Sequence, residues 1–375
     1  MEEVLGGHTA DNQFAVFLTD WEAILARRVE EAVAAFGQVK GLHGLILAGG
    51  LGRGAPWPLS DIDLIPIYAD DRPEAAAEIE MLRLAFLERW IAEGWWSGLD
   101  IGRLRFSRRE VQRARSANPP ALSTLLADDR WYHTMDKAFG GCTLIDLDGI
   151  ATSLVAWFSA LRFTPAVVAY RLQREQQELV NSQHAFALAV NSGDMLAATG
   201  HLRNAAKWLF TLHLERWGER DNSQGRIGTR FVTAAHAHGA DALVDTVHAL
   251  SDLVEPQVWQ RLATAPPWVR ERHDRSLRAR LHVGEPIAPL ADARDTLRVC
   301  SLYALRRETT PPYPEWLAIL DQATAQEYAA VLQHVITTTG KISLGSPPGR
   351  TAAGGPTTHQ ASASLPCLQA RTHRR

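Results

Sequence analysis

The chain has 375 residues, of which 46% are hydrophobic and 22% charged, and a formal net charge of −3. These fractions exclude wholesale disorder, the length favours two domains over one, and no run of about 18 apolar residues predicts a membrane span. The three scattered cysteines exclude a four-cysteine zinc site. Together with an acidic N-terminus that has no apolar run, they favour a cytoplasmic location.

The charge is unevenly distributed. Residues 341–375 contain five basic residues and no acid, so residues 1–340 carry −8. Because an acidic body is poorly suited to bind phosphate backbones, nucleic acid is not expected as a partner. A small molecule or a protein is the expected substrate.

The first 140 residues mix helical and strand patterns. Apolar residues at helical spacing predict helices over residues 14–36 and 74–93. Short apolar or alternating runs predict strands over residues 42–47, 61–68 and 99–106. The glycine- and proline-rich residues between the first two strands predict a loop or a broken short helix. We expect one compact unit in which helices flank a small mixed sheet, and an overall fold class of α+β.

After Ala121 the pattern predicts helices and no strand. Helical spacing of apolar residues covers residues 121–138, 151–161, 165–190, 193–217, 229–251, 256–264, 291–307 and 322–337. A helical bundle is therefore expected. Gly, Pro, Ala, Ser and Thr dominate the C-terminal segment, which is expected to be disordered because it has few large apolar groups. The predicted domains are residues 1–140, residues 141–340 and a tail over residues 341–375.

Two aspartates, Asp61 and Asp63, carry the main chemical signal. Residues two apart on a strand point to the same face, so both carboxylates are expected to project together. Neighbouring carboxylates repel unless a cation lies between them, and hard oxygen ligands suit Mg²⁺ or Mn²⁺. Asp100, in the third predicted strand, would complete a cluster of three carboxylates if the two strands are neighbours.

The segment before these aspartates has residues typical of phosphate binding. Gly49 and Gly50 end the first predicted strand, and glycine lets the backbone turn sharply and a phosphate approach its N–H groups. Arg53 can offer a planar fork to phosphate oxygens. Ser60 can cap the turn or donate a hydrogen bond to a phosphate. These four residues are the predicted nucleotide-binding residues.

A Gly-Gly pair, a gap of ten residues, Asp-x-Asp on a strand and a later acid resemble the nucleotidyltransferase superfamily of DNA polymerase β type. The text GGLGRGAPWPLSDIDL is most similar to the N-terminal domain of the PII-protein uridylyltransferase group. LDIGRLRFS and ALSTLLADDRWYHTMDKAF are similar to segments that follow in that group. The resemblance covers roughly residues 40–140. It implies a palm-like domain in which Gly49 and Gly50 hold a nucleoside triphosphate and Asp61, Asp63 and Asp100 bind the metal.

The resemblance has limits. Many members have Gly-Ser where this chain has Gly49-Gly50, a change that is usual in the uridylyltransferase group. That group's phosphohydrolase domain is not expected, because His273-Asp274 lacks matching flanking histidines. Neither uridylyl removal nor PII as a substrate is therefore transferred.

The implied activity is metal-dependent transfer of a nucleoside monophosphate, adenylyl or uridylyl, from a nucleoside triphosphate to an acceptor hydroxyl, with release of pyrophosphate. The helical domain would present the acceptor. A small hydroxylated molecule is preferred over a protein tyrosine, and the acidic body favours a cationic acceptor. Polar positions that could line the acceptor site are Glu175, Glu178, Arg203 and Lys207.

Two alternatives stay open. One is a catalytically silent module that binds nucleotide as a signal. The other is a toxin–antitoxin-type pairing of a nucleotidyltransferase with an RNase-like helical domain, for which Arg275 and His282 would supply the required Arg-x4–6-His motif.

Overall fold

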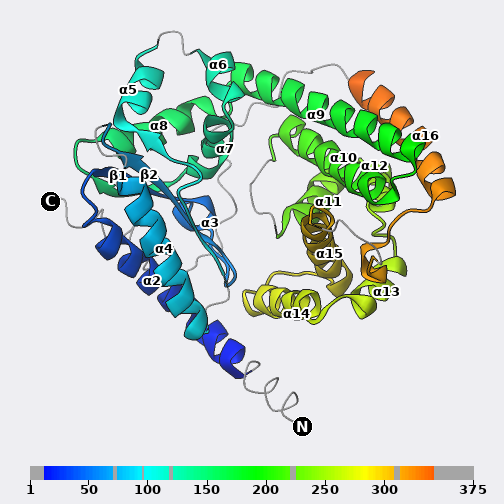
Figure 1. Ribbon diagram of the computed structural model, residues 1–375, viewed down its shortest axis with the longest axis horizontal. Coiled ribbons are helices and arrows are strands. Elements are labelled where there is room, and N and C mark those ends of the chain that lie inside the picture. The colour runs from blue at the N-terminus through cyan, green and yellow to red at the C-terminus, as the bar shows by residue number, and fades with distance from the viewer. Residues whose placement is uncertain are drawn as a thin grey trace. The chain divides into compact units, whose positions relative to one another are not determined.

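The computed structural model describes residues 12–70, 74–94, 97–117, 121–219, 225–307 and 313–341. Its fold is mixed α+β, as predicted, and it divides into two compact units whose main boundary lies between Val167 and Val168. Figure 1 shows the sheet in the blue and cyan part of the chain and the second group of helices in green to orange. The disorder predicted for residues 341–375 lies, from residue 342 onward, outside the described residues.

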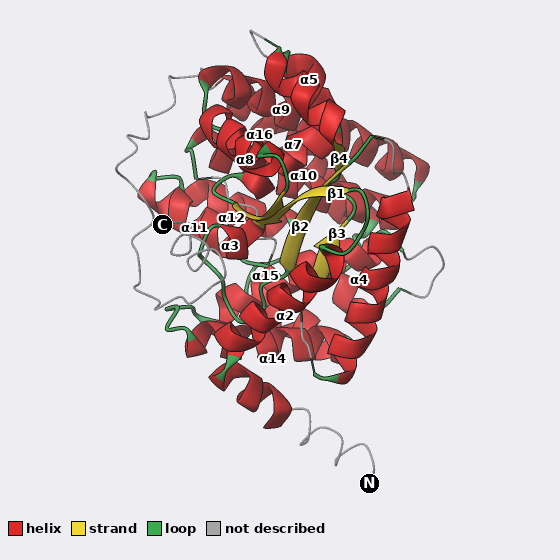
Figure 2. Cartoon of the chain, turned by 90° about the vertical axis from the view of Figure 1, so that its left-hand side faces the viewer, coloured by secondary structure: helices red, strands yellow, loops and turns green. Residues whose placement is uncertain are grey.

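In the described residues, the first unit contains a mixed sheet of five short strands. They are β1 (Leu42–Ala48), β2 (Ile62–Tyr68), β3 (Leu99–Ile101), β4 (Phe106–Ser107) and β5 (Cys142–Asp146). The order is β3-β2-β1-β5, and β4 also pairs with β2. β1 is antiparallel to β2 and β5, whereas β3 and β4 are parallel to β2. Figure 2 labels β1, β2, β3 and β4 of this sheet. The sheet therefore places the C-terminal end of β1 next to the N-terminal ends of β2 and β3.

Two strand predictions need correction. The single strand predicted over residues 99–106 is split into β3 and β4, because Gly102 adopts a φ of +103°. The prediction of no strand after Ala121 is wrong, since β5 pairs with β1. All residues of β5 are half-buried, so it lacks the alternation that would reveal it. The sheet unit accordingly continues past the expected boundary at residue 140.

Helices surround this sheet. They are α2 (Trp21–Phe36), α3 (Gly49–Gly52), α4 (Glu74–Ala92), α5 (Arg108–Ser116), α6 (Leu122–Ala127), α7 (Asp129–Ala138) and α8 (Ile150–Leu161). The helix predicted over residues 14–36 is interrupted at Asp20. α4 packs on β3, while α7 and α8 pack on β1.

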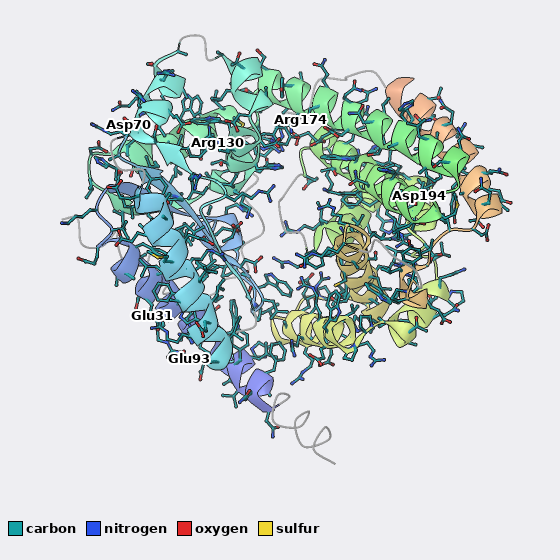
Figure 3. The ribbon with its side chains drawn as sticks, in the orientation of Figure 1. Glu31, Asp70, Glu93, Arg130, Arg174 and Asp194 are labelled. Atoms are coloured by element: carbon teal, nitrogen blue, oxygen red, sulfur yellow. The ribbon has the colours of Figure 1, made fainter. Side chains whose placement is uncertain are left out.

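α7 is anchored at both ends. At its start Arg130 (labelled in Figure 3) donates to Asp128 at 2.8 Å and to Glu110 of α5 at 2.9 Å. At its end Asp136 pairs with Arg162, and both side chains are buried. These contacts hold the last turn of α7 in a defined position.

The described residues of the second unit are helical, as predicted. The helices are α9 (Pro165–Ser192, mostly in this unit), α10 (Met195–Arg216), α11 (Ile227–Ala237), α12 (Asp241–Leu250), α13 (Gln257–Thr264), α14 (Pro267–His282), α15 (Pro289–Leu305), the 3-10 turn η1 (Glu315–Leu317) and α16 (Gln322–Lys341). The apolar spacing does not predict α14, because its buried residues other than Val269 are Ser276, Ala279 and Arg280, which form no apolar stripe.

A buried charged cluster joins three of these helices. Arg280 of α14 is fully buried and donates to Asp295 of α15 at 3.1 Å. Its Nε lies 3.1 Å from Asp292, also fully buried. Asp295 in turn accepts the backbone N–H groups of Gly228 and Thr229 in α11, at 2.9 and 3.2 Å. Buried charges are tolerated only when paired in this way, so this cluster ties α11, α14 and α15 together.

Among the described helices, no single one is both long and apolar enough to cross a membrane; the bent pair α8 and α9 meets that test only together.

Candidate active site

The sheet brings two of the predicted acids together. Asp63 of β2 and Asp100 of β3 lie directly opposite one another in parallel register. The expected neighbourhood of these strands is therefore confirmed. Burial raises the pKa of the Asp63 carboxyl most, and the nearby charges of Asp61 and Asp100 raise it further.

The glycine turn lies against one of these carboxylates. Gly49 directly follows β1, and Ala48 at the end of β1 pairs with Asp63. Gly49 has a φ of +65°, which favours glycine. A Cβ at this position would lie only 2.1 Å from Oδ2 of Asp63. Both the backbone angle and the lack of space for a Cβ therefore require glycine at position 49. The absence of a side chain there lets the turn pack directly against the Asp63 carboxylate.

Lys137 is a site residue that sequence reasoning missed. It lies in the last turn of α7, and its ammonium donates to Oδ1 of Asp63 and, at 3.1 Å, to Oδ2 of Asp100. The exposed fractions of the side chains are 14% for Asp63, 24% for Lys137 and 46% for Asp100. The ammonium therefore bridges a protected carboxylate and a more accessible one.

One signal could have pointed to Lys137. The chain has 39 basic residues, yet only Lys40, Lys137, Lys207 and Lys341 are lysines. Lysine is a compact point charge on a flexible stem, unlike the planar fork of arginine. With so few lysines in the chain, each one is a candidate partner for the predicted acids. Lys137 is 74 positions from Asp63, however, so its contact depends on how α7 packs against the sheet.

Burial and charge act in opposite directions in this group. Burial is the largest influence on Asp63 and raises its pKa, and the Lys137 ammonium only partly offsets that rise. For Lys137, burial favours the neutral amine, but Asp63 and Asp100 outweigh it and raise the pKa of the ammonium. Lys137 thus keeps its proton, and it supplies the positive charge that the buried carboxylate needs.

Asp61 is held differently from the expected arrangement. β2 begins only at Ile62, and Oδ1 of Asp61 accepts hydrogen bonds from Ser97 Oγ at 2.7 Å and from the Gly98 N–H at 3.0 Å. Within the described part of the chain, no three acidic, histidine or cysteine side chains are grouped so as to hold a metal ion. In the described residues the three predicted acids therefore do not form a metal-binding group: Lys137 bridges Asp63 and Asp100, and metal binding stays a prediction.

The other predicted nucleotide-binding residues surround the turn. Ser60 is buried, and its Oγ accepts the N–H of Trp57 at 2.9 Å, which is the predicted cap. A Cβ on Gly50 would lie 3.7 Å from that hydroxyl, so the Ser60 side chain packs close to the glycine turn. Arg53 Nη1 lies 3.5 Å from the carbonyl oxygen of Asp136 and so extends toward the end of α7.

No family model, curated protein or solved structure matches this chain. The chemistry assigned to the site accordingly rests on the arrangement of its own residues.

The structure places three residues that were considered for the acceptor or RNase roles. Arg203 is buried and donates to the carbonyl oxygen of Ala318 at 2.9 Å, so it does not line an open site. Arg275 and His282 both lie on α14, and Arg275 donates to Glu271 at 2.9 Å.

Replacing Lys137 with methionine is expected to raise the pKa of the Asp63 carboxyl further, because burial and the charges of Asp61 and Asp100 would then act without the ammonium. A carboxyl whose folded-state pKa is raised disfavours folding once it ionises. Lys137→Met should therefore be destabilised by about 2 kcal/mol at pH 7, with the deficit shrinking as the pH falls through the pKa of Asp63. Carbon-13 NMR titration and urea unfolding at several pH values measure both effects. The control is Lys40→Met, an exposed lysine; equal results for the two variants would contradict the bridging role.

Proposed function

We propose that the first unit catalyses metal-dependent nucleotidyl transfer, moving a nucleoside monophosphate from a nucleoside triphosphate to an acceptor hydroxyl with release of pyrophosphate. The observation that carries this proposal is the packing of the Gly49 turn against Asp63, which lies in register with Asp100. A glycine turn can present backbone N–H groups to phosphate oxygens, and carboxylates can hold the cations that accompany them. Their proximity supports phosphoryl chemistry in a small α+β unit.

The acids fit a divalent cation by their donor chemistry. Asp63 and Asp100 already hold one positive charge, the Lys137 ammonium, and Asp61 adds a third hard oxygen donor nearby. Mg²⁺ and Mn²⁺ prefer such ligands. Asp63 and Asp100, which face one another, would hold the metal, and Asp61 would join them only once the carboxylates closed around the ion. The metal would offset the charge on the phosphate oxygens during transfer.

The side chains and backbone of the site would carry out the other parts of the reaction. The acceptor oxygen forms a bond to the α-phosphorus, and the bond from that phosphorus to the α–β bridging oxygen breaks as pyrophosphate leaves. Asp100 is more exposed than Asp63, the other carboxylate bridged by Lys137, and it can accept the proton of the attacking hydroxyl. Lys137 counters the negative charge of Asp63 and Asp100, while the Gly49–Gly50 backbone orients the triphosphate.

The Lys137 bridge also favours a second candidate function. An ammonium between Asp63 and Asp100 occupies the position where a catalytic cation is expected. A module with this arrangement can bind nucleotide as a signal without transferring it. The two functions differ in one measurable respect, the release of pyrophosphate.

The test compares two aspartate variants of the full chain. Asp63→Asn is expected to lower pyrophosphate release and labelled product by at least about 10²-fold, measured with each nucleoside triphosphate, Mg²⁺ and a panel of anionic, neutral and cationic hydroxyl acceptors. The matched control is Asp70→Asn, an exposed aspartate of the same unit (Figure 3), which should retain activity. Chelation of the divalent cation should abolish transfer. Nucleotide binding without pyrophosphate release from any acceptor would refute transfer and favour the sensor.

A further inference from the structure

A pocket of about 410 Å³ opens beside Asp100 in the first unit. That volume lies in the range of about 300–1,000 Å³ that is typical of small-molecule sites. Its lining includes three arginines from two elements: Arg83 of α4, and Arg103 and Arg105 from the segment that joins β3 to β4. The strand register thus places a basic pocket next to the accessible acid of the candidate active site.

The charges of this pocket are arranged for an anion. Arg83 is paired with Glu80 through two hydrogen bonds of 2.7 and 2.6 Å, which fix its guanidinium. Arg103 and Arg105 are exposed, and their guanidinium groups form no ion pair or hydrogen bond with any described residue. Since Asp100 is already bridged to Lys137, two positive charges are left without a protein counter-ion. Guanidinium forks match planar or tetrahedral oxyanions.

A buried hydroxyl lies close to the same charges. Tyr68 at the end of β2 is 7% exposed, and within the described residues its hydroxyl has no hydrogen-bond partner. Arg105 and Glu80, both in the pocket lining, act electrostatically on it, and burial raises the pKa of Tyr68 to about 12. The hydroxyl therefore stays protonated and keeps an unused donor near the arginines. Unused buried donors are uncommon in folded proteins.

The sheet order places this pocket on the side away from the glycine turn. Gly49 follows β1, Asp63 lies on β2 and Asp100 lies on β3, which is at the edge of the sheet. In phosphoryl transfer the attacking and leaving oxygens lie roughly in line on opposite sides of the phosphorus. If the glycine turn holds the triphosphate, the attacking hydroxyl must come from the side of β3, where the pocket opens.

We infer that the pocket formed by Arg83, Arg103 and Arg105 binds an anionic group of the acceptor, so that the acceptor is a small hydroxylated molecule carrying a phosphate or a carboxylate. That the bound molecule acts as the acceptor rests on the proposed function, whereas binding of an anion by the pocket does not. The inference differs from the cationic acceptor favoured by the net charge, because the local charge beside Asp100 is opposite to that of residues 1–340 as a whole.

Calorimetric titration of the full chain tests anion binding directly. The probes are glycerol 3-phosphate, glycerate and glycerol, which present a phosphate, a carboxylate and no charge on similar skeletons. An anionic probe should bind and glycerol should not, and the tighter of the two anions identifies the source of the charge. Arg103→Ala/Arg105→Ala should weaken anion binding at least about tenfold, as expected for the loss of charge-assisted hydrogen bonds.

The matched control is Arg113→Ala/Arg115→Ala, which removes the same charge from two exposed arginines of α5 outside the pocket. Equal affinity in the two double variants, or no binding of either anion at millimolar concentration, would overturn the inference. If transfer is observed, the pocket variant should raise KM for an anionic acceptor without a matching loss of kcat. Anion binding without any transfer refutes the proposed function alone, whereas transfer with an unchanged KM in the pocket variant refutes the pocket's role alone.

Discussion

Gly49→Ala should lower nucleotidyl transfer by at least about 10²-fold in a chain that still folds. The new Cβ would lie 2.1 Å from Oδ2 of Asp63, so that carboxylate must leave its present position opposite Asp100 and beside Lys137. A displacement of about 1 Å at a reacting centre can cost about 10²-fold in rate. Alanine at a φ of +65° also adds backbone strain of about 1–2 kcal/mol. Transfer kinetics and thermal unfolding measure the two effects separately.

Gly54→Ala separates the clash from the strain. Gly54 lies in the same loop with a φ of +72°, but a Cβ there meets no atom within 4 Å. This variant should lose a similar amount of stability, about 1–2 kcal/mol, and keep most of its transfer activity. A comparable loss of transfer in both variants would mean that the Asp63 contact is not what makes Gly49 necessary.

Asp295→Ala is expected to destabilise the helical unit by about 3–5 kcal/mol, the usual cost of removing one partner of a buried charge pair. Asp295 is 2% exposed and accepts hydrogen bonds from Arg280, from Arg298 and from the backbone of α11. Its removal leaves two buried or nearly buried guanidinium groups with fewer acceptors and two backbone N–H groups with none from this residue. Urea unfolding followed by far-ultraviolet circular dichroism should show a lower midpoint.

Asp274→Ala provides the comparison for Asp295→Ala. Asp274 pairs with Arg278 on the outer face of α14 at 3.4 Å, and its side chain is 57% exposed. Exposed pairs of this kind contribute at most about 1 kcal/mol. If the two variants unfold at the same urea concentration, the buried cluster does not hold α11, α14 and α15 together.

The net charge of residues 1–340 is negative, whereas the pocket beside Asp100 is lined by three arginines. Net charge describes how a whole protein attracts partners at long range, whereas recognition depends on the groups within hydrogen-bond distance. If the proposed transfer takes place, we therefore expect Arg103 and Arg105 to affect acceptor binding more than the charge of −8 over residues 1–340 does. The transfer assay with acceptors of each charge discriminates between the two expectations.

Local sequence patterns were sufficient for much of the fold. The strands β1 and β2, the helix α4 and most helices of the second unit were predicted because their apolar residues repeat with the period of the element. The same holds for the position of the Gly49–Gly50 turn at the end of β1. Each of these features depends on residues close together in the chain.

Elements with mixed or polar inner faces escaped prediction. β5 is half-buried along its whole length, and α14 buries Ser276 and Arg280, so neither has a clear apolar period. Their formation depends on partners supplied by other segments, β1 in one case and Asp292 and Asp295 in the other.

The sequence by itself was therefore sufficient to identify the acids and the glycine turn as candidate site residues, because the strand patterns place them at the ends of predicted strands and spacing along a strand decides which side chains share a face. Only the tertiary structure decided that Lys137 bridges Asp63 and Asp100, that Asp61 is held by Ser97 and Gly98, and that arginines line a pocket at the edge of β3. The contacts of Lys137 and Asp61 join residues 36 or more positions apart, and no local period encodes the packing that brings such residues together.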